Sequence, residues 1–458
     1  MADTRRRPWL ASLVLLVAFL WAACTHSKPV GVRAGTEGSN GFQLFHGLED
    51  VGRADSIPLL DDALGGVSLI GLGESVHASG GFHAARLNLV KYLVTHHGYR
   101  VILLETPVDD TRAGADYVLR GEGNAPGAVH TWYICWQSVE SVQLLEWLRA
   151  FNAAHPASPV FFSGFDIRQG DADVRFLQSA LRTQPKDPGP ALIRRALTDC
   201  PVPGDANAFY SLEKEVWDGK RRISNEEKRE CLGALDELER YVRASDSDPA
   251  RRQELLWTLV HLNNLRSWVS SMAALGTGTP RATDTERDRG LARNVRLLPE
   301  ALTGAPAKAI YIAHNLHVAK AVRRLQSSEA GIANFVSMGE ILKEEMGEAY
   351  RAIGLLAFEV GMNWPGLQPS PLWFREGPDT LESQMNGLAE PYVLLSPRAA
   401  PPEIPTEDRS FGTLFREDGP TGDPVSFRGN VGEQFDLVFF LRRSEALVPA
   451  SDPPKEPG

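Results

Sequence analysis

The chain has 458 residues, 43% of them hydrophobic and 23% charged, which are the proportions of an ordinary globular protein with a large core. Its length by itself suggests two or three domains. The formal net charge of −10 at pH 7 argues against a nucleic acid or an anionic membrane surface as a partner.

The N-terminus has the pattern of an export signal. Three arginines, residues 5–7, precede an apolar run over 9–23 that is slightly too short to span a bilayer. The run ends at Cys24 in a pattern that resembles the lipobox of bacterial lipoproteins, apart from Trp21 where leucine is usual. We expect residues 1–23 to be a signal peptide and the mature protein to be exported as a lipoprotein anchored at Cys24, its only membrane contact. Cleavage without lipidation, which gives a periplasmic or secreted protein, is the alternative.

A strand, helix and strand open the folded part of the chain. Residues 67–72 are apolar and predict a buried strand, and the polar segment 73–77 follows it directly. The helical pattern that comes next ends at Gly98, and a second apolar strand covers 100–104. We therefore predict a βαβ unit whose two strands are parallel neighbours.

The rest of the chain predicts one α/β domain over 41–445. A helix is expected over 139–152, and no strand pattern interrupts the helical signals of about 170–300. The sequence thus predicts a mostly parallel central sheet flanked by helices, with an inserted helical subdomain over its carboxyl edge. Further strands are expected at 159–165, 308–313, 352–358, 392–396 and 435–441, with mostly loop over 359–432, a flexible tether at 24–40 and a disordered tail at 446–458.

The cysteines leave two alternatives open. In an exported protein Cys200 and Cys231 are candidates for a disulfide, with Cys135 as a buried thiol. Three unpaired structural cysteines are the other interpretation.

Acidic and histidine side chains follow four of the predicted strands. Because the carboxyl ends of parallel strands meet at one edge of a sheet, these side chains are expected to share that edge, where α/β folds bind their ligands. Acids and histidines that arrive there independently are typical of an active site. They are Glu74, His77, Glu105, Asp166, His314 and His317.

Glu74 and His77 are three residues apart, so the carboxylate can hold one imidazole nitrogen and leave the other to act as a general base. The alternative is structural, with Glu74 capping the next helix and His77 packed in the core. Arg86 would pair with Glu105 or donate to an oxyanion, unless it is a solvated arginine on a helix face.

His314 and His317 would stabilise a developing negative charge or protonate a leaving alkoxide. Two glutamates and three histidines are also good zinc ligands, although no His-Glu-x-x-His spacing is present. Ser75 lies in a near miss of the Gly-x-Ser-x-Gly nucleophile motif and ranks below activated water as the nucleophile. The aromatic residues of 131–136 would form either a substrate groove or part of the core. No phosphate-binding loop or dinucleotide motif is present, so no cofactor is expected.

An ordered series of motifs resembles the erythromycin esterase family over roughly residues 45–445. Where that family commonly has glycine directly after its base histidine, this chain has Ala78, and where it often has an acid, this chain has Gly81. The motifs are Gly73-Glu74-Ser75-Val76-His77 with Arg86, the strand ending in Glu105, Leu145-Glu146-Trp147-Leu148-Arg149 with Asn152, Gly164-Phe165-Asp166, Arg287-Asp288 with Ala292-Arg293-Asn294, and Ala313-His314-Asn315-Leu316-His317.

The resemblance implies a metal-independent hydrolase of carboxylic esters, in which a histidine activates water to open a macrolide lactone, a reaction that inactivates the antibiotic. By position His77 is the base, and the supporting polar residues are Glu74, Arg86, Glu105, His314 and His317. The expected partner is a small-molecule ester or lactone. The alternatives are a non-catalytic, envelope-anchored protein for ligand binding or biogenesis, and a metal-dependent hydrolase.

Overall fold

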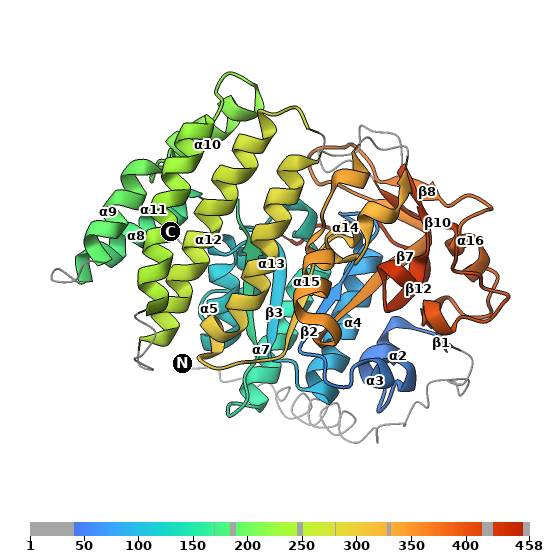
Figure 1. Cartoon of the computed structure of the whole chain (residues 1–458). Coiled ribbons are helices and arrows are strands. Elements are labelled where there is room, and N and C mark those ends of the chain that lie inside the picture. Colours follow the sequence, from blue (N-terminus) through green and yellow to red (C-terminus); the bar gives the residue numbers. More distant parts are fainter. Residues whose placement is uncertain are drawn as a thin grey trace, which may run out of the picture.

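A computed structural model describes residues 41–168, 170–183, 189–244, 251–279, 281–327, 331–414 and 425–451 (Figure 1). The predicted signal peptide, Cys24 and the tether lie outside the described residues. None of the helices that the structure describes combines the length and the apolar character needed to cross a membrane.

A mixed sheet forms the centre of the described chain, as predicted. Six strands run parallel, and antiparallel strands are added at one end of the sheet and beside β7. The order is β1 (Phe42–Phe45), β9 (Tyr392–Leu395), β12 (Leu437–Ser444), β7 (Tyr350–Met362), β2 (Leu69–Leu72), β5 (Ala309–Ile312), β3 (Val101–Pro107) and β4 (Phe161–Asp166), with β8 (Leu372–Arg375) paired to β7.

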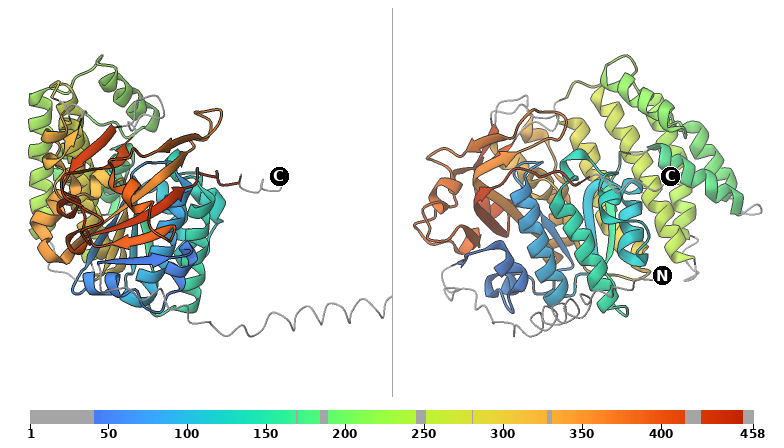
Figure 2. Two further views of the ribbon diagram at one scale, coloured as in Figure 1. Left: turned by 90° about the vertical axis from the view of Figure 1, so that its right-hand side faces the viewer. Right: turned by 180° about the vertical axis from the view of Figure 1, so that it is seen from behind.

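Helices cover both faces of this sheet. Successive strand residues point to opposite faces, so Ile70 packs into one hydrophobic core and Leu69 into the other. Seen from behind, one face carries α4 (Gly80–His97), α5 (Arg112–Arg120) and α7 (Val139–Ala154) (Figure 2). The other carries α13 (Ala282–Thr303) and α15 (Met338–Met346), while α2 (Leu48–Arg53), α3 (Pro58–Ala63), α6 (Ala125–Val129), α14 (Asn315–Val318), α16 (Leu381–Met385) and α17 (Val431–Gln434) are shorter.

The neighbours of the first strand differ from the prediction. β2 and β3 are parallel, but β5 lies between them and pairs with both. A crossover connection can leave a gap of one strand, and an apolar β-branched segment over 200 residues later fills this gap. The position of β5 matters for function, because it places the histidines that follow β5 between Glu74 and Glu105.

The helical insertion is present between β4 and β5, and in its described residues no strand interrupts the helices. They have a hydrophobic core of their own, and α13 packs against β4. The helices are α8 (Gly170–Thr183), α9 (Gly189–Asp199), α10 (Ala206–Trp217), α11 (Asn225–Ala244), α12 (Arg252–Leu275) and α13.

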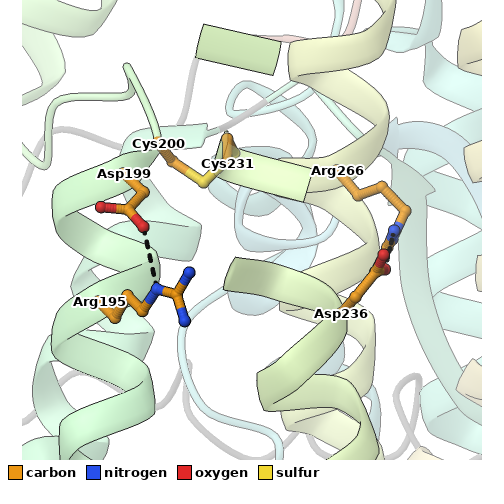
Figure 3. The surroundings of a disulfide bond; sticks show 6 residues. All are labelled: Arg195, Asp199, Cys200, Cys231, Asp236 and Arg266. Carbon is orange, nitrogen blue, oxygen red and sulfur yellow. Dashed lines mark hydrogen bonds and ion pairs between the residues drawn. A yellow bond between two sulfur atoms is a disulfide. The ribbon is translucent and has the colours of Figure 1, made fainter. Parts of the chain in front are cut away.

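A disulfide joins Cys200, directly after α9, to Cys231 on α11 (Figure 3). Of the two alternatives for the cysteines, the structure therefore has the bonded one, with Cys135 as a buried free thiol. With a sequence separation of 31 between the two cysteines, the loss of chain entropy in the unfolded state corresponds to roughly 3–4 kcal/mol of stability. The ion pairs Arg195–Asp199 and Arg266–Asp236 flank the bond.

Two predictions for the C-terminal part are wrong. The region 359–432 contains strands as well as loops, because β7 continues to Met362 and β8 pairs with it, while β10 (Arg409–Leu414), β11 (Val425–Gly429) and β6 (Gln326–Ser327) form a second sheet. Residues 446–451 are ordered, since the N–H of Val139 donates to the carbonyl of Val448 and the Leu447 side chain is buried in the core. The sequence pattern does not reveal that the backbone of 446–451 bonds to other segments. Residues 452–458 lie outside the described residues.

Candidate active site

The loop between β2 and α4 is fixed by backbone hydrogen bonds to β7 and to the first residue of α14. The N–H of Gly73 donates to the carbonyl of Ile353 at 2.9 Å, and the N–H of Asn315 donates to the carbonyl of Glu74 at 2.7 Å. A Cβ on residue 73 would lie 1.9 Å from the Asn315 side-chain oxygen, so only glycine fits there. The segment that carries Glu74 and His77 is therefore held rigidly at the carboxyl edge.

Ala78 follows His77 in a left-handed conformation, with φ at 59°. This conformation costs an L-residue about 1–2 kcal/mol, and glycine avoids the cost. The Ala78 methyl group is fully buried, which returns about 0.8 kcal/mol, and alanine loses less chain entropy on folding than glycine. These terms nearly cancel, which explains how alanine is accommodated beside the site.

Glu74, His77 and Arg86 form one connected group. His77 Nδ1 lies 2.6 Å from Glu74 Oε1, and Arg86 Nη2 donates to Glu74 Oε2 at 2.6 Å. Glu74 is fully buried, so both of its oxygens are used by cations or donors inside the protein. Because the Nδ1 proton is directed at Glu74, the Nε2 atom of neutral His77 carries the lone pair.

Of the three alternatives predicted for Arg86, the structure excludes two, because the side chain is buried and is not paired with Glu105. It points back from α4 to Glu74, and its guanidinium lies 4.7 Å from the Trp136 ring centroid. His83, one turn earlier on the same helix, stacks on Trp136 at 5.2 Å and bonds the Ser138 hydroxyl at 2.8 Å. Trp136 thus forms a wall behind the Glu74 group.

A second group surrounds Glu105 at the end of β3. Arg287, on α13, donates to Glu105 Oε1 at 2.9 Å and to Asp166 Oδ2 at 2.7 Å. Burial by itself raises the pKa of Glu105, but His317 and Arg287 hold that pKa well below its ordinary value. Glu105 is therefore an anion enclosed by cations. The helical insertion reaches the site through Arg287 and its neighbour Asp288.

His317 lies between two carboxylates. Its Nδ1 is 2.8 Å from Asp288 Oδ1, and its Nε2 is 3.2 Å from Glu105 Oε1. Burial would lower the pKa of His317, but the two carboxylates hold that pKa well above its ordinary value. The ring is consequently an imidazolium at neutral pH, and it orients Glu105.

His314 uses both ring nitrogens for backbone groups. Its Nε2–H donates to the carbonyl of Ser75 at 2.9 Å, and its Nδ1 accepts from the N–H of Leu316 at 3.2 Å. Burial and the neighbouring histidines lower its pKa to about 4, so the ring is neutral at pH 7. His314 lies 5.0 Å from His77 between ring centroids and fixes the loop that carries it.

A cavity of about 230 Å³ connects the two groups of charged residues, and it is called the catalytic cavity below. His77 and Glu105 both line it, as the predicted shared edge requires. Its walls are partly aromatic, which supports the groove interpretation for Tyr133 and Trp136, whereas Trp132 is core. The lining residues are His77, Glu105, Tyr133, Ile134, Cys135, Trp136, Arg168, Arg287 and Trp364.

Of the predicted candidates, only His77 and Glu105 are on this wall. The candidates that do not line the cavity are Glu74, Ser75, Arg86, Asp166, His314 and His317. Ser75 and His314 line a separate apolar cavity of about 20 Å³. Across the described ranges, no group of three or more histidine, cysteine or acidic side chains has the geometry to hold a metal ion.

Several site residues were not among the sequence candidates. Arg287 and Asp288 were visible only as part of a family motif. Arg168 follows β4 by two residues and lines the cavity, with no ion pair to any residue in the described ranges. Trp364 comes from the region predicted to be mostly loop, where no pattern marks it.

The sheet topology, the buried acid–histidine pair and the cavity define an α/β protein with the residues of a hydrolytic site. The sequence model described as "Erythromycin esterase" matches residues 94–444. The chain therefore belongs to the erythromycin esterase family.

Several known proteins are similar to this chain. The Bacillus subtilis (strain 168) protein named "Putative hydrolase YbfO" is 27% identical over 111 residues, about 24% of each chain, so the match spans only a quarter of that relative. A Bacillus cereus protein of solved structure has a TM-score of 0.69 at 20% identity, over 88% of this chain and 94% of its own.

Two further crystal structures share the fold. A succinoglycan biosynthesis protein has a TM-score of 0.67 at 16% identity, over 89% of this chain and 95% of its own. A histidine-to-asparagine mutant of the erythromycin esterase EreC, in its open conformation, has a TM-score of 0.62 at 16% identity, over 90% of this chain and 99% of its own.

Proposed function

We propose that this protein hydrolyses a carboxylic ester or lactone with water activated by His77. One observation carries the proposal: His77, with Nδ1 held by buried Glu74 at 2.6 Å, stands on the wall of a cavity that also presents arginines. Family membership supports the ester as the bond that is cut. We propose a macrolide lactone as one candidate substrate.

In the proposed reaction, His77 Nε2 takes a proton from a water molecule while the water oxygen attacks the carbonyl carbon. Glu74 stabilises the imidazolium that forms, and Arg86 keeps Glu74 in place. The negative charge that develops on the carbonyl oxygen is stabilised by the Arg168 guanidinium. The tetrahedral intermediate then expels the alcohol, which takes the proton back from His77, and leaves the carboxylic acid.

His314 and His317 have positioning roles in this mechanism. His314 holds the carbonyl of Ser75, two residues before the base, and His317 orients Glu105 against Arg287. Both rings act on the cavity through a neighbour, which suits their buried positions.

The cavity volume bears on the substrate. About 230 Å³ is below the 300–1,000 Å³ of sites that enclose a drug-sized ligand, so we infer that the reacting ester enters while a large substrate remains partly outside. Tyr133, Trp136 and Trp364 would pack against its apolar part. A suitable panel therefore contains erythromycin, small lactones, aryl esters and acylated sugars, the last because one structural neighbour is named for succinoglycan biosynthesis.

The test compares His77→Asn and Arg168→Gln with wild type across this panel. We expect at least one compound to be hydrolysed, with kcat/KM lower by roughly 10²–10⁴-fold in His77→Asn. His46→Asn is the matched control, because His46 also lies 2.6 Å from a glutamate, Glu390, but is exposed. Full activity of folded His77→Asn would refute the proposed base.

A second class of function predicts a different result in the same panel. An envelope-anchored binding or biogenesis protein would be stabilised thermally by a ligand and would show no turnover. A metal-dependent hydrolase would lose activity after chelation and regain it with the metal. Neither outcome is expected here.

We also propose that the protein is exported and anchored at Cys24. The Cys200–Cys231 disulfide supports export, because disulfides persist in oxidising compartments.

A further inference from the structure

A second and larger cavity lies against β4, the strand at one end of the sheet. Its volume is about 440 Å³, nearly twice that of the catalytic cavity, and the two share no lining residue. It is called the edge cavity here, and its lining residues come from β4, α5 and the helical insertion, among other segments. Its lining residues are Val108, Asp109, Thr111, Arg112, Ala115, Asp116, Arg120, Phe162, Ser163, Phe176, Trp257, His261 and Leu302.

His261, on the wall of the edge cavity, belongs to a second buried pair of a histidine and an acid, and the acid, Asp173, lies behind that wall. His261 Nδ1, from α12, lies 2.7 Å from Asp173 Oδ1, from α8, and both side chains are at most 4% exposed. Asn264 Nδ2 donates to the same Asp173 oxygen at 3.0 Å. The pair repeats the arrangement of His77 and Glu74, in which a carboxylate fixes the imidazole.

One polar atom of each residue in this pair has no hydrogen-bond partner among the described residues. Within the described ranges, Asp173 is the only hydrogen-bond partner of His261, which leaves the ring nitrogen Nε2 for a group inside the cavity. Asp173 Oδ2 is buried and makes no hydrogen bond to a described residue. Since most buried polar atoms are hydrogen-bonded, such exceptions mark places where a ligand or solvent completes the structure.

The remaining walls favour an apolar ring. Phe176 stacks on His261 at 3.8 Å between ring centroids, and Trp257 lies 6.3 Å from the same imidazole. Phe162 contributes a third aromatic side chain from β4. A flat apolar body would find faces to stack on there.

The charged residues of the edge cavity neutralise one another. Arg112 pairs with Asp109 at 3.3 Å, and Arg120 pairs with Asp116. A ligand therefore gains little from a net charge. A hydroxyl group is the best match for His261, because it can either donate to a neutral imidazole nitrogen or accept from a protonated one.

We propose that the edge cavity is a second binding site, which takes a small neutral molecule with an aromatic or cyclic apolar body and a hydroxyl group bonded to His261. The site is independent of the ester hydrolysis proposed above. If instead the His261–Asp173 pair only ties α12 to α8, its replacement would lower stability without affecting any ligand.

Two probes of the same shape separate these roles. 4-Methylphenol carries the hydroxyl, and p-xylene replaces it with a methyl group. Calorimetric titration of the full chain should show saturable binding of 4-methylphenol at one site, and soaked crystals should show its oxygen beside His261. His261→Phe keeps a ring against Phe176 and should lower the affinity for 4-methylphenol relative to p-xylene by roughly 3- to 10-fold.

Ala115→Phe is the second variant, because Ala115 lines the cavity from the half-exposed surface of α5 and is not a member of the pair. It fills the cavity and should weaken both probes even if His261→Phe fails to fold. His77→Asn should bind both probes as wild type does. Absence of saturable binding at millimolar concentrations, or equal affinities in wild type and Ala115→Phe, would overturn the proposal.

Discussion

Replacing Arg86 with methionine tests whether the Arg86 guanidinium stabilises the buried charge of Glu74. Arg86 is 3% and Glu74 0% exposed, and the two side chains approach to 2.6 Å. Methionine keeps a chain of similar length over the Trp136 ring but removes the guanidinium. Among the described residues, Glu74 would then keep His77 Nδ1 as its side-chain hydrogen-bond partner, with His83 Nε2 at 3.8 Å.

Removing one partner of such a pair costs about 3–5 kcal/mol, because the remaining charge stays in a low-dielectric environment. This is a large part of the 5–15 kcal/mol that stabilises a typical domain. The cation–π contact with Trp136 adds about 1 kcal/mol to the loss. We therefore expect the free energy of unfolding of Arg86→Met to fall by about 4–6 kcal/mol.

The measurement is urea unfolding of wild type, Arg86→Met, Glu74→Gln and the double variant. The double variant should be at least about 2 kcal/mol more stable than Arg86→Met, because glutamine removes the unpaired charge. Both variants that lack Glu74 should lose ester hydrolysis, since His77 is no longer oriented. A loss below about 1 kcal/mol in Arg86→Met, or a double variant less stable than the single one, would contradict this account.

Two further predictions concern His317 and Cys24. The pKa of His317 is raised in the folded protein. The contribution of the protonated ring to the free energy of unfolding is therefore fully present below the ordinary histidine pKa of 6.5, and it is lost as the pH rises through the raised pKa. The stability difference between wild type and His317→Gln should accordingly shrink as the pH rises above 6.5, and a difference constant from pH 5 to 9 would argue against the charged state. Cys24→Ser should move the protein from the membrane fraction to the soluble fraction of the producing cells, whereas an unchanged distribution would exclude the lipid anchor.

Local sequence patterns were sufficient to predict the strands and the polar residues that follow them. The apolar run before Glu74, the β-branched run before His314 and the strand before Glu105 are signals of a few residues, and each is confirmed as β2, β5 and β3. Because parallel strands share a carboxyl edge, these patterns also predicted that His77 and Glu105 would face one cavity.

The interaction partners of these side chains could not be predicted from local sequence patterns. Arg86 was predicted to pair with Glu105, to donate to an oxyanion or to be solvated, and its hydrogen bond to Glu74 was not predicted, because the direction of a long side chain depends on what packs around the helix. Arg287 comes from a helix 182 residues away from Glu105 in sequence. No spacing rule connects residues at that separation.

The sequence by itself determined the fold class, the helical insertion and the identity of the acid and the histidine at the exit of β2. The tertiary structure decided that β5 lies between β2 and β3, and this placement brings His314 against the loop of His77 and His317 against Glu105. Strand order and the pairing of buried charges depend on packing between distant segments, whereas strand and helix formation depends on the side-chain pattern of a few consecutive residues.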